Sequence, residues 1–367
     1  MKIGIITMHR VINYGSFLQA YSLKEVLEKM GHDVVFIDYK PGKPVVPYDK
    51  KAYFKGKIKN NPTLSRMITT VRNKTKGPDS FYNFADKYSQ EYLKMLGVGN
   101  KYEYHTPVDA VIIGSDEVFN CLQPNANVGF TGELFGQNQN TKKKMSYAAS
   151  FGYTTYNKLD DLKLTDTIKN WLSDFQSLSI RDTNSKEILE KMGFDNVSKN
   201  VDPVFLGEYE GLVPEETDLT DYIIVYTYSG RKYTQEQEQM IMDFAKNNNK
   251  KIVTIGKHKE WSDIKLQANP FEMITYFKNA DFVFTDTFHG SVFSIKYNVP
   301  FATLIREDNK QKLGDLLRTF QLESRKIENL SELENMYKTP VDFTTANQII
   351  IENKEKSIQY LRNNLEA

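Results

Sequence analysis

The sequence predicts an α/β protein made of two Rossmann-like, doubly wound domains that face each other across a cleft. Short apolar segments typical of buried strands alternate with amphipathic segments typical of helices, first over 3–203 and again over 222–305. The length of 367 residues fits two domains at a typical ~150 residues each. The segment 207–221 between them is acidic and interrupted by glycine and proline, as domain linkers are.

The first element is a strand at 3–7, followed by a helix from Ser16 to Met30 with apolar residues at helical spacing. Ser16 is predicted to cap this helix, and Gly31, which tolerates a left-handed turn, to end it. A second strand at 34–39 completes a strand–helix–strand unit, so the sheet is expected to be parallel.

The first domain continues with the same alternation as far as residue 206. One helix is predicted over 159–175, and Asn184 with Glu187 resembles a capping box that begins another. Further strands are predicted at 109–114, 144–149, 178–181 and 201–203.

The second domain is predicted over 222–343, and the helix of the final segment 344–367 is expected to pack back on the first domain. Its first strand, at 222–228, is nearly all apolar, which indicates burial on both faces. Further strands are predicted at 251–255, 281–285 and 301–305. Helices are predicted at 234–247, 271–279, 289–297, 311–320 and 344–364. Two such domains and a long terminal helix are typical of the GT-B architecture.

Composition excludes several classes of protein. Hydrophobic residues make up 40% of the chain, enough for two cores, which excludes a largely disordered protein. The 48 Lys and Arg against 47 Asp and Glu give a net charge of +1, so we expect no nucleic-acid partner. Cys121 is the only cysteine, which excludes an intrachain disulfide and a cysteine-based zinc site. The chain opens on a predicted strand and contains no apolar segment near the ~18 residues of a membrane span, so we expect a cytoplasmic protein.

An insertion at about 41–105 interrupts the α/β pattern. Between Lys50 and Lys76 it carries nine basic residues and no acidic one. One interpretation is a solvated, partly helical segment. The other is a basic patch that contacts a membrane surface peripherally, where it binds an anionic carrier such as a saccharide linked to a diphosphate lipid.

Motifs for cofactors and metals are missing from the sequence. The first strand is not followed by G-x-G-x-x-G, and no P-loop, D-x-D, H-x-H or H-E-x-x-H motif occurs. We therefore expect neither a dinucleotide cofactor nor a metal site.

The segment 282–291 carries a histidine at the end of a predicted buried strand. A helix begins within three residues, so His289 is expected near a helix N-terminus at the carboxyl edge of a sheet. The backbone N–H groups of Gly290 and Ser291 would attract an anion there, and Gly290 would let it approach closely. We interpret His289 as a general acid. The alternative is a packing histidine that covers the strand end.

Other polar residues are also expected at strand ends. Arg181 follows an apolar strand, where it either clamps a carboxylate or phosphate or pairs with Asp182 or Asp202. Asp116 either accepts a hydroxyl proton or caps a helix. Arg306 follows the strand 301–305 and is a further candidate anion contact.

The turn after the first strand is the last candidate. Asn13, Tyr14 and Gly15 either line the cleft or serve only as turn residues.

Taken together, these segments resemble the polysaccharide pyruvyl transferase family. The residues that carry the resemblance are, in chain order, 13–15 with 18–20, 114–116, 146–152, 179–182, 202–203, and 285–290 with 293–294. The insertion and the residues beyond about 325 show little of it.

The resemblance implies a GT-B-like fold and a reaction in polysaccharide biosynthesis, exopolysaccharide included. Family members transfer the carboxyethylidene group of phosphoenolpyruvate to two hydroxyls of one sugar and form a cyclic ketal. The family's histidine corresponds to His289 and its strand-end arginine to Arg181. Many members carry arginine where this chain has Thr287, so the resemblance implies that a contact is missing or is supplied by Arg306. It also places Thr287 and Phe288 among the substrate-binding residues.

This chemistry gives each candidate a role. Arg181 would clamp one anionic group of the donor, and the N–H groups of Gly290 and Ser291 the other. His289 would deliver a proton, and Asp116 would act as base, with no metal needed. Two alternatives stay open: a GT-B glycosyltransferase that uses a nucleotide sugar, and a non-catalytic glycan-binding relative, which Thr287 motivates.

Overall fold

The computed structural model describes residues 1–48, 87–125, 128–141, 143–228, 231–256 and 258–366. The basic segment Lys50–Lys76 lies outside these described residues. The chain divides into two compact units. Unit 1 consists of Met1–Gly207 with Asn353–Ala367, and unit 2 of Glu208–Glu352. The two are described separately.

Unit 1 is built on a sheet of six parallel strands in the order β2-β1-β3-β4-β5-β6. The strands are β1 (Lys2–Ile6), β2 (Asp33–Phe36), β3 (Ala110–Asp116), β4 (Lys143–Ala149), β5 (Leu178–Ile180) and β6 (Val197–Lys199). The chain builds the sheet outward from β1 in one direction and then, from β3, in the other. The crevice between the carboxyl ends of β1 and β3 is therefore the topological switch point, where such sheets bind ligands.

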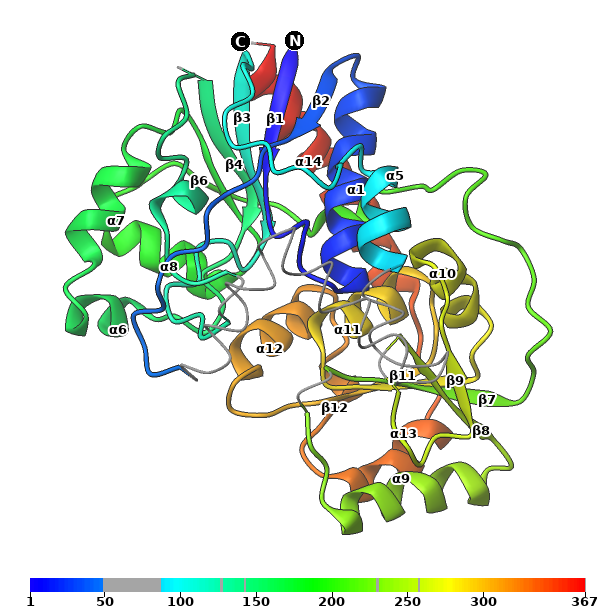
Figure 1. Cartoon of the computed structure of the whole chain (residues 1–367). Coiled ribbons are helices and arrows are strands. Elements are labelled where there is room, and N and C mark those ends of the chain that lie inside the picture. The colour runs from blue at the N-terminus through cyan, green and yellow to red at the C-terminus, as the bar shows by residue number, and fades with distance from the viewer. Residues whose placement is uncertain (49–86, 126–127, 142, 229–230, 257, 367) are drawn as a thin grey trace, which may run out of the picture. The chain divides into compact units, whose positions relative to one another are not determined.

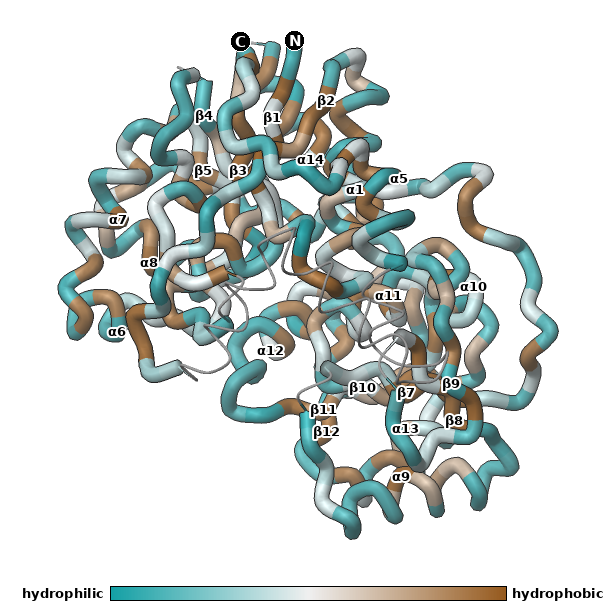
Figure 2. Tube along the Cα trace, in the orientation of Figure 1, coloured by the Kyte–Doolittle hydropathy of each residue, from teal (hydrophilic) through white to brown (hydrophobic). Residues whose placement is uncertain are grey.

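Helices cover both faces of this sheet. The longer helices are α1 (Tyr14–Lys29), α6 (Tyr156–Asp161), α7 (Thr165–Leu172) and α8 (Thr183–Lys191), with short turns at Tyr88–Tyr92, Leu93–Met95 (α5), Gly132–Phe135 and Pro203–Phe205. Helices α7 and α8 lie on one face, where Ile168 and Ile188 share a core with Val111 and Ile113 of β3. Helix α1 and part of α14 lie on the other (Figure 1). The strands between them are the most hydrophobic part of the unit (Figure 2).

Unit 2 is also built on a sheet of six parallel strands, in the order β12-β11-β10-β7-β8-β9. Its strands are β7 (Tyr222–Tyr226), β8 (Lys251–Ile255), β9 (Ile264–Leu266), β10 (Phe282–Thr285), β11 (Phe301–Leu304) and β12 (Lys326–Ile327). Its helices are α9 (Gln235–Asn247), α10 (Pro270–Lys278), α11 (Phe288–Lys296), α12 (Lys310–Thr319) and α13 (Leu333–Lys338), with short turns at Glu323–Arg325 and Leu330–Glu332. Its switch point lies between β7 and β10.

Aromatic side chains fill the core of unit 2. On the face covered by α10 and α11, the rings of Tyr226, Phe277 and Phe293 contact one another with centroids 5.3–6.2 Å apart. On the opposite face, Phe244 of α9 packs on Phe282 at 5.9 Å. Such edge-to-face pairs add about 0.5–1.5 kcal/mol each beyond the area they bury.

The final helix, α14 (Thr344–Leu365), has residues in both units. Its C-terminal part, from Asn353, belongs to unit 1 and packs on β4. The Tyr360 hydroxyl donates to the Ser146 carbonyl at 2.9 Å, and Lys143 Nζ donates to the Leu365 carbonyl at 2.8 Å.

Two predicted elements of unit 1 are wrong. The short strand expected at 201–203 is absent, because β6 lies earlier and Asp202 instead caps the turn that starts at Pro203. The single helix expected over 159–175 is two helices, α6 and α7. The chain breaks between them at Lys163, whose φ of 55° is incompatible with a continuous right-handed helix.

Two predicted helix caps of unit 1 are also wrong. Asn13, not Ser16, caps α1, and its Oδ1 accepts the Gly15 N–H at 2.7 Å. Asp182, not Asn184, caps α8, and its Oδ1 accepts the Ser185 N–H at 2.8 Å. In unit 2, the sequence analysis missed β9, β12 and α13, which are all short.

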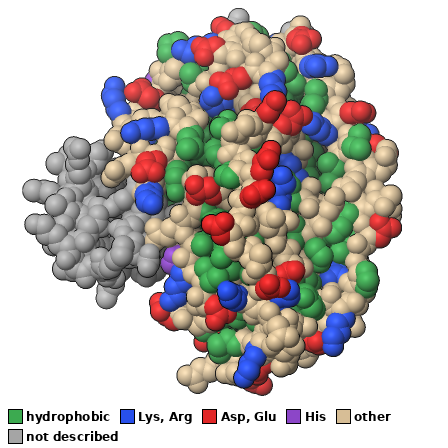
Figure 3. Space-filling view, turned by 90° about the vertical axis from the view of Figure 1, so that its right-hand side faces the viewer, with side chains coloured by type: hydrophobic (Ala, Val, Ile, Leu, Met, Phe, Trp, Pro, Cys, Tyr) green, Lys and Arg blue, Asp and Glu red, His purple; other side chains and the backbone are tan. Residues whose placement is uncertain are grey.

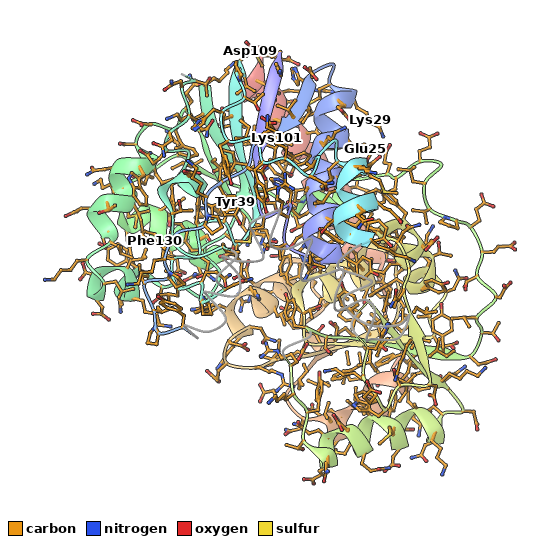
Figure 4. All side chains as sticks on the ribbon, in the orientation of Figure 1. Glu25, Lys29, Tyr39, Lys101, Asp109 and Phe130 are labelled. Carbon is orange, nitrogen blue, oxygen red and sulfur yellow. The ribbon has the colours of Figure 1, made fainter. Side chains whose placement is uncertain are left out.

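The two edges of the unit 1 sheet are easily located from labelled residues. Asp109 immediately precedes β3 and marks the amino edge, whereas Tyr39 follows β2 toward the carboxyl edge (Figure 4). Over the face drawn in Figure 3, acidic and basic side chains are interspersed, in keeping with the near-zero net charge. No helix in the described part of the chain combines the length and the apolar composition that a membrane-spanning segment requires.

Candidate functional site

Most of the predicted site residues lie at the carboxyl edge of one sheet or the other. Asp116 ends β3, and Arg181 follows β5, both in unit 1. In unit 2, His289 lies in the first turn of α11 after β10, and Arg306 follows β11. The structure thus brings Asp116 together with Arg181 within one unit. It describes His289 and Arg306 within the other.

In unit 1, Arg181 joins two carboxylates in a buried network. Its Nη1 donates to Asp202 Oδ2 at 2.7 Å, and its Nη2 lies 3.6 Å from Asp116 Oδ1. Ser115 Oγ also donates to Asp202, at 3.3 Å, and Ser16 Oγ donates to Asp116 Oδ2 at 2.7 Å. The pairing with Asp202 is one of the two that the sequence suggested. Asp182, the other, is occupied by Ser150 and by capping α8.

The electrostatics of this network favour a charged arginine. The Arg181 side chain is only 3% exposed, and burial opposes its charge. Asp202 and then Asp116 outweigh burial, so that the pKa of the guanidinium is raised. One arginine facing two aspartates leaves the network with a net negative charge, which suits hydrogen-bond donors such as sugar hydroxyls.

Two residues with strained backbone lie at the same edge. Asp116 has a φ of 73°, in the left-handed region that costs most residues about 1–2 kcal/mol. On the adjacent strand, Ala148 has a φ of 48° and forms a bulge, because five residues from Met145 to Ala149 oppose four from Ser177 to Ile180. Bulges and strained residues of this kind are frequent beside functional sites.

The predicted residues at the start of α1 have structural roles. Asn13 caps the helix, as described above, and the Gly15 N–H is the donor to that cap. The Tyr14 side chain is buried. Of the two interpretations offered by the sequence, the structure documents turn and cap chemistry for this segment.

A second buried network lies at the ends of β1 and β2. Asp38 accepts hydrogen bonds from Arg10 Nη2 at 2.9 Å and from the Glu103 N–H at 2.8 Å, and its Oδ1 lies 3.1 Å from His9 Nε2. Burial opposes ionisation of Asp38, but the hydrogen bonds from Arg10 and His9 outweigh it. They hold the pKa of Asp38 well below its usual range.

In unit 2, the N-terminus of α11 is closed by its own cap. Thr287 Oγ1 accepts the Gly290 N–H at 2.9 Å, and the Thr287 carbonyl accepts the Ser291 N–H at 3.3 Å. These are the two N–H groups that the sequence suggested for an anion. A Cβ on Gly290 would lie 2.2 Å from Thr285 Oγ1, so glycine is required there by packing within the unit.

His289 is held in the first turn of the same helix. It is 5% exposed, with its ring 5.4 Å from that of Phe288 in an edge-on arrangement and 6.1 Å from that of Phe293. An imidazole surrounded by aromatic rings has few alternative orientations. Its position, three residues after Asp286 at the carboxyl edge of β10, is the one that the sequence predicted.

Asp286 is the centre of a group that sequence analysis missed. It is fully buried, and its Oδ2 lies 3.3 Å from Arg231 Nε, from Arg306 Nε and from the hydroxyl of Tyr233. Burial raises the pKa of Asp286 although the two arginines oppose that shift. The available signal was position, since Asp286 and Arg306 follow two strands and Arg231 lies in the loop after a third.

Within the described residues, no three His, Cys, Asp or Glu side chains gather closely enough to hold a metal ion.

Comparisons with known proteins complete the description. The family described as polysaccharide pyruvyl transferase matches residues 13–309. No curated protein matches the chain in sequence. Among solved structures, Arabidopsis thaliana UGT89C1 in complex with quercetin aligns with a TM-score of 0.51 at 10% identity, over 98% of both chains. UDP-GlcNAc 2-epimerase from Methanocaldococcus jannaschii aligns with a TM-score of 0.49 at 12% identity, over 96% of this chain and 99% of that one. With the two parallel sheets, the likeness to UGT89C1 identifies a GT-B-like fold of two Rossmann-like units.

Proposed function

Because the chain belongs to the polysaccharide pyruvyl transferase family, we propose that it transfers the carboxyethylidene group of phosphoenolpyruvate to two hydroxyls of a sugar. The sugar is part of a surface polysaccharide or of its precursor. The observation that carries the proposal is the family match, which covers the strands from β2 to β11 and includes His289 at the carboxyl edge of β10. Since phosphoenolpyruvate is a cytoplasmic metabolite, we place the reaction in the cytoplasm, on a free or lipid-linked acceptor.

The reaction balances without an oxidant or a reductant. The first sugar hydroxyl adds to C2 of phosphoenolpyruvate, and C3 takes up a proton to become a methyl group. The bond between C2 and the phosphate oxygen then breaks, and inorganic phosphate leaves. The second hydroxyl adds to C2 and loses its proton, which closes the cyclic ketal.

We propose that His289 is the general acid that donates the proton to C3. A positioned general acid typically accelerates such a step ~10²–10⁴-fold. The surrounding rings of Phe288 and Phe293 limit the orientations of the imidazole, as a proton donor to one specific carbon requires. Catalysis by correctly oriented groups depends on such fixed geometry.

We assign to Asp116 the role of the base that accepts the proton of the acceptor hydroxyl. Its carboxylate is partly exposed at the switch point of unit 1 and already accepts one hydroxyl, that of Ser16, at 2.7 Å. A sugar hydroxyl presents the same chemical group. The strained backbone at Asp116 holds this carboxylate at the end of β3.

Arg181 is proposed to clamp one anionic group of the donor. An incoming carboxylate would compete with Asp116, whose Oδ1 lies 3.6 Å from Arg181 Nη2, and would leave the shorter contact to Asp202 in place. A guanidinium serves two acceptors at once more readily than an ammonium does.

Ligand-dependent stability tests the choice of donor. A ligand that binds only the folded protein raises its free energy of unfolding and therefore its melting temperature. At a ligand concentration of 100 times Kd, the gain in stability is about 2.7 kcal/mol. We expect phosphoenolpyruvate to raise it and a panel of nucleotide sugars to have no effect. Mass spectrometry of saccharides incubated with the protein and phosphoenolpyruvate should show the gain of one carboxyethylidene group. Stabilisation by nucleotide sugars alone, with transfer of the sugar, would instead identify a glycosyltransferase.

A further inference from the structure

Cationic side chains from the loops after β7, β8 and β11 meet in unit 2 around a carboxylate at the end of β10. We call Arg231, Tyr233, Lys259, Asp286 and Arg306 the Asp286 cluster. These residues are far apart in the sequence and come together because β11, β10, β7 and β8 are neighbours in the sheet, in that order. Neither the family match nor the mechanism above gives Arg231 or Lys259 a role.

One carboxylate oxygen of the buried Asp286 contacts the guanidinium groups of two arginines. Asp286 Oδ2 lies 3.3 Å from the Nε of both Arg231 and Arg306. Nη2 of Arg231 donates to Asp308 Oδ1 at 2.9 Å, whereas Nη2 of Arg306 is buried without a hydrogen-bond partner among the described residues. A buried charged donor without a partner costs about 1–3 kcal/mol or more, so a ligand that supplies an acceptor is favoured.

A third cation approaches the same group. Lys259 Nζ donates to the Arg231 carbonyl at 2.7 Å and lies 5.2 Å from the centre of the Tyr233 ring. The Arg306 guanidinium lies 5.3 Å from the centre of that ring. The aromatic ring thus holds two cations near each other, each by an attraction of about 0.5–2 kcal/mol.

The charges of the cluster do not cancel. Arg231, Arg306 and Lys259 face two carboxylates, the buried Asp286 and Asp308, which is 54% exposed and therefore well solvated. The net charge of the cluster is positive. Because water screens the exposed Asp308, that carboxylate compensates little of the positive charge. Burial lowers the pKa of Lys259, so a second anion near it would favour its charged form.

We propose that the Asp286 cluster is the binding site for a phosphate group. Two guanidinium forks and an ammonium match the charge and the several oxygens of a phosphate dianion better than those of a single carboxylate. The N–H groups of Gly290 and Ser291 in α11 already have acceptors within the helix, so side chains must supply the charge that such a ligand needs.

This inference rests on the proposed function where it names the source of the phosphate. His289 follows Asp286 by three residues and lies in the first turn of α11, so a phosphate in the cluster brings its organic part to the edge that holds the imidazole. We therefore assign the cluster to the phosphate of phosphoenolpyruvate. When the bond between C2 and the phosphate oxygen breaks, the same side chains stabilise the leaving phosphate. Inorganic phosphate should accordingly compete with the donor.

Calorimetric titration of the full chain with inorganic phosphate tests the site itself. We expect Arg231→Gln and Arg306→Gln each to raise the Kd for phosphate about tenfold or more, the typical effect of losing a charge-assisted contact. Arg318→Gln is the matched control, because that side chain is 69% exposed on α12 and should leave the Kd unchanged. Arg306→Lys, which keeps the charge but loses the fork, should give an intermediate Kd even if a glutamine variant folds poorly. Equal phosphate binding by all folded variants would overturn the site.

The donor arm separates this inference from the proposed function. Phosphoenolpyruvate should bind with the same sensitivity to Arg231→Gln and Arg306→Gln, and phosphate should displace it. If phosphate binding is lost in these variants but phosphoenolpyruvate does not bind, the site stands and the proposed function fails. If UDP binds in its place with the same sensitivity, the phosphate belongs to a nucleotide, and the assignment to the donor is overturned. If phosphoenolpyruvate is transferred normally by both variants, the proposed function stands and the inference fails.

Discussion

The two units are each built on a sheet of six parallel strands but differ in the charge at the carboxyl edges of their sheets. In unit 1, one arginine, Arg181, lies between two carboxylates, Asp116 and Asp202. In unit 2, one buried carboxylate, Asp286, lies between two arginines, and a lysine is close by. The same backbone plan therefore presents a negative edge in one unit and a positive edge in the other.

This difference indicates which substrate each unit handles. A neutral sugar offers hydroxyl groups, which donate well to carboxylates, whereas phosphoenolpyruvate carries a carboxylate and a phosphate that need cations. We therefore propose that unit 1 binds the acceptor and that unit 2 binds the phosphate of the donor. The fold alone does not determine which substrate each unit binds. The side chains at the carboxyl ends of the strands determine it.

The largest effect is expected at His289, on the positive edge. His289→Ala should lower kcat by ~10²–10⁴ because the proton for C3 loses its donor. His105→Ala is the control, since that residue is exposed in a loop of unit 1. Circular dichroism and the melting temperature should show that both variants fold. A rate near that of the unaltered protein for His289→Ala would remove the general acid from the proposal.

The next effect concerns a carboxylate at the negative edge, Asp38. Its pKa is held below the unfolded value near 4, so its contribution to stability is full above that pH and is lost as the pH falls through the folded pKa. Asp38→Asn should cost about 3–5 kcal/mol at pH 7, the typical loss on breaking a buried pair. The difference from the unaltered protein should shrink below about pH 4. Urea unfolding at pH values from 7 to 3 measures this difference in the free energy of unfolding. Asp160→Asn, at an exposed position, is the control. A difference for Asp38→Asn that does not depend on pH would contradict the pairing.

A pair of glycines tests whether packing or a ligand explains the start of α11. Gly290→Ala should destabilise unit 2 by about 1–3 kcal/mol, because its Cβ would meet Thr285 Oγ1 at 2.2 Å. Gly314→Ala in α12, where a Cβ meets nothing within 4 Å, should stabilise by about 0.5–1 kcal/mol. Thermal unfolding without ligand measures both. Loss of donor binding by Gly290→Ala at unchanged stability would restore the direct ligand role.

The smallest effect sharpens the role of Arg181 at the negative edge. If Arg181 clamps the donor, Arg181→Lys should raise KM for phosphoenolpyruvate about tenfold, since lysine cannot serve two acceptors in the same way. If it only positions Asp116 and Asp202, kcat and the melting temperature should fall while the donor KM stays constant. Steady-state kinetics with each substrate varied in turn separates these outcomes.

Local patterns in the sequence predicted most elements of the fold and the positions of Asp116, Arg181 and His289. Alternation of strands and helices is a local property, so the parallel sheets could be expected before the structure was seen. The Asp286 cluster could not, because Arg231 and Arg306 are brought together only by the order of the strands, which no local pattern contains. The hydrogen bonds at the start of α11 could not be predicted either. The sequence shows that Thr287 is unusual at its position, but not that its Oγ1 accepts the Gly290 N–H.

The most direct test of the account follows the labelled donor carbon into the product. The full chain is incubated with phosphoenolpyruvate labelled at C3, with a series of purified saccharide precursors, and with a nucleotide sugar as competitor. The account predicts that the label appears as the methyl group of a cyclic ketal on one saccharide, with one inorganic phosphate released for each ketal formed. Label that stays in phosphoenolpyruvate while the nucleotide sugar is consumed would contradict it.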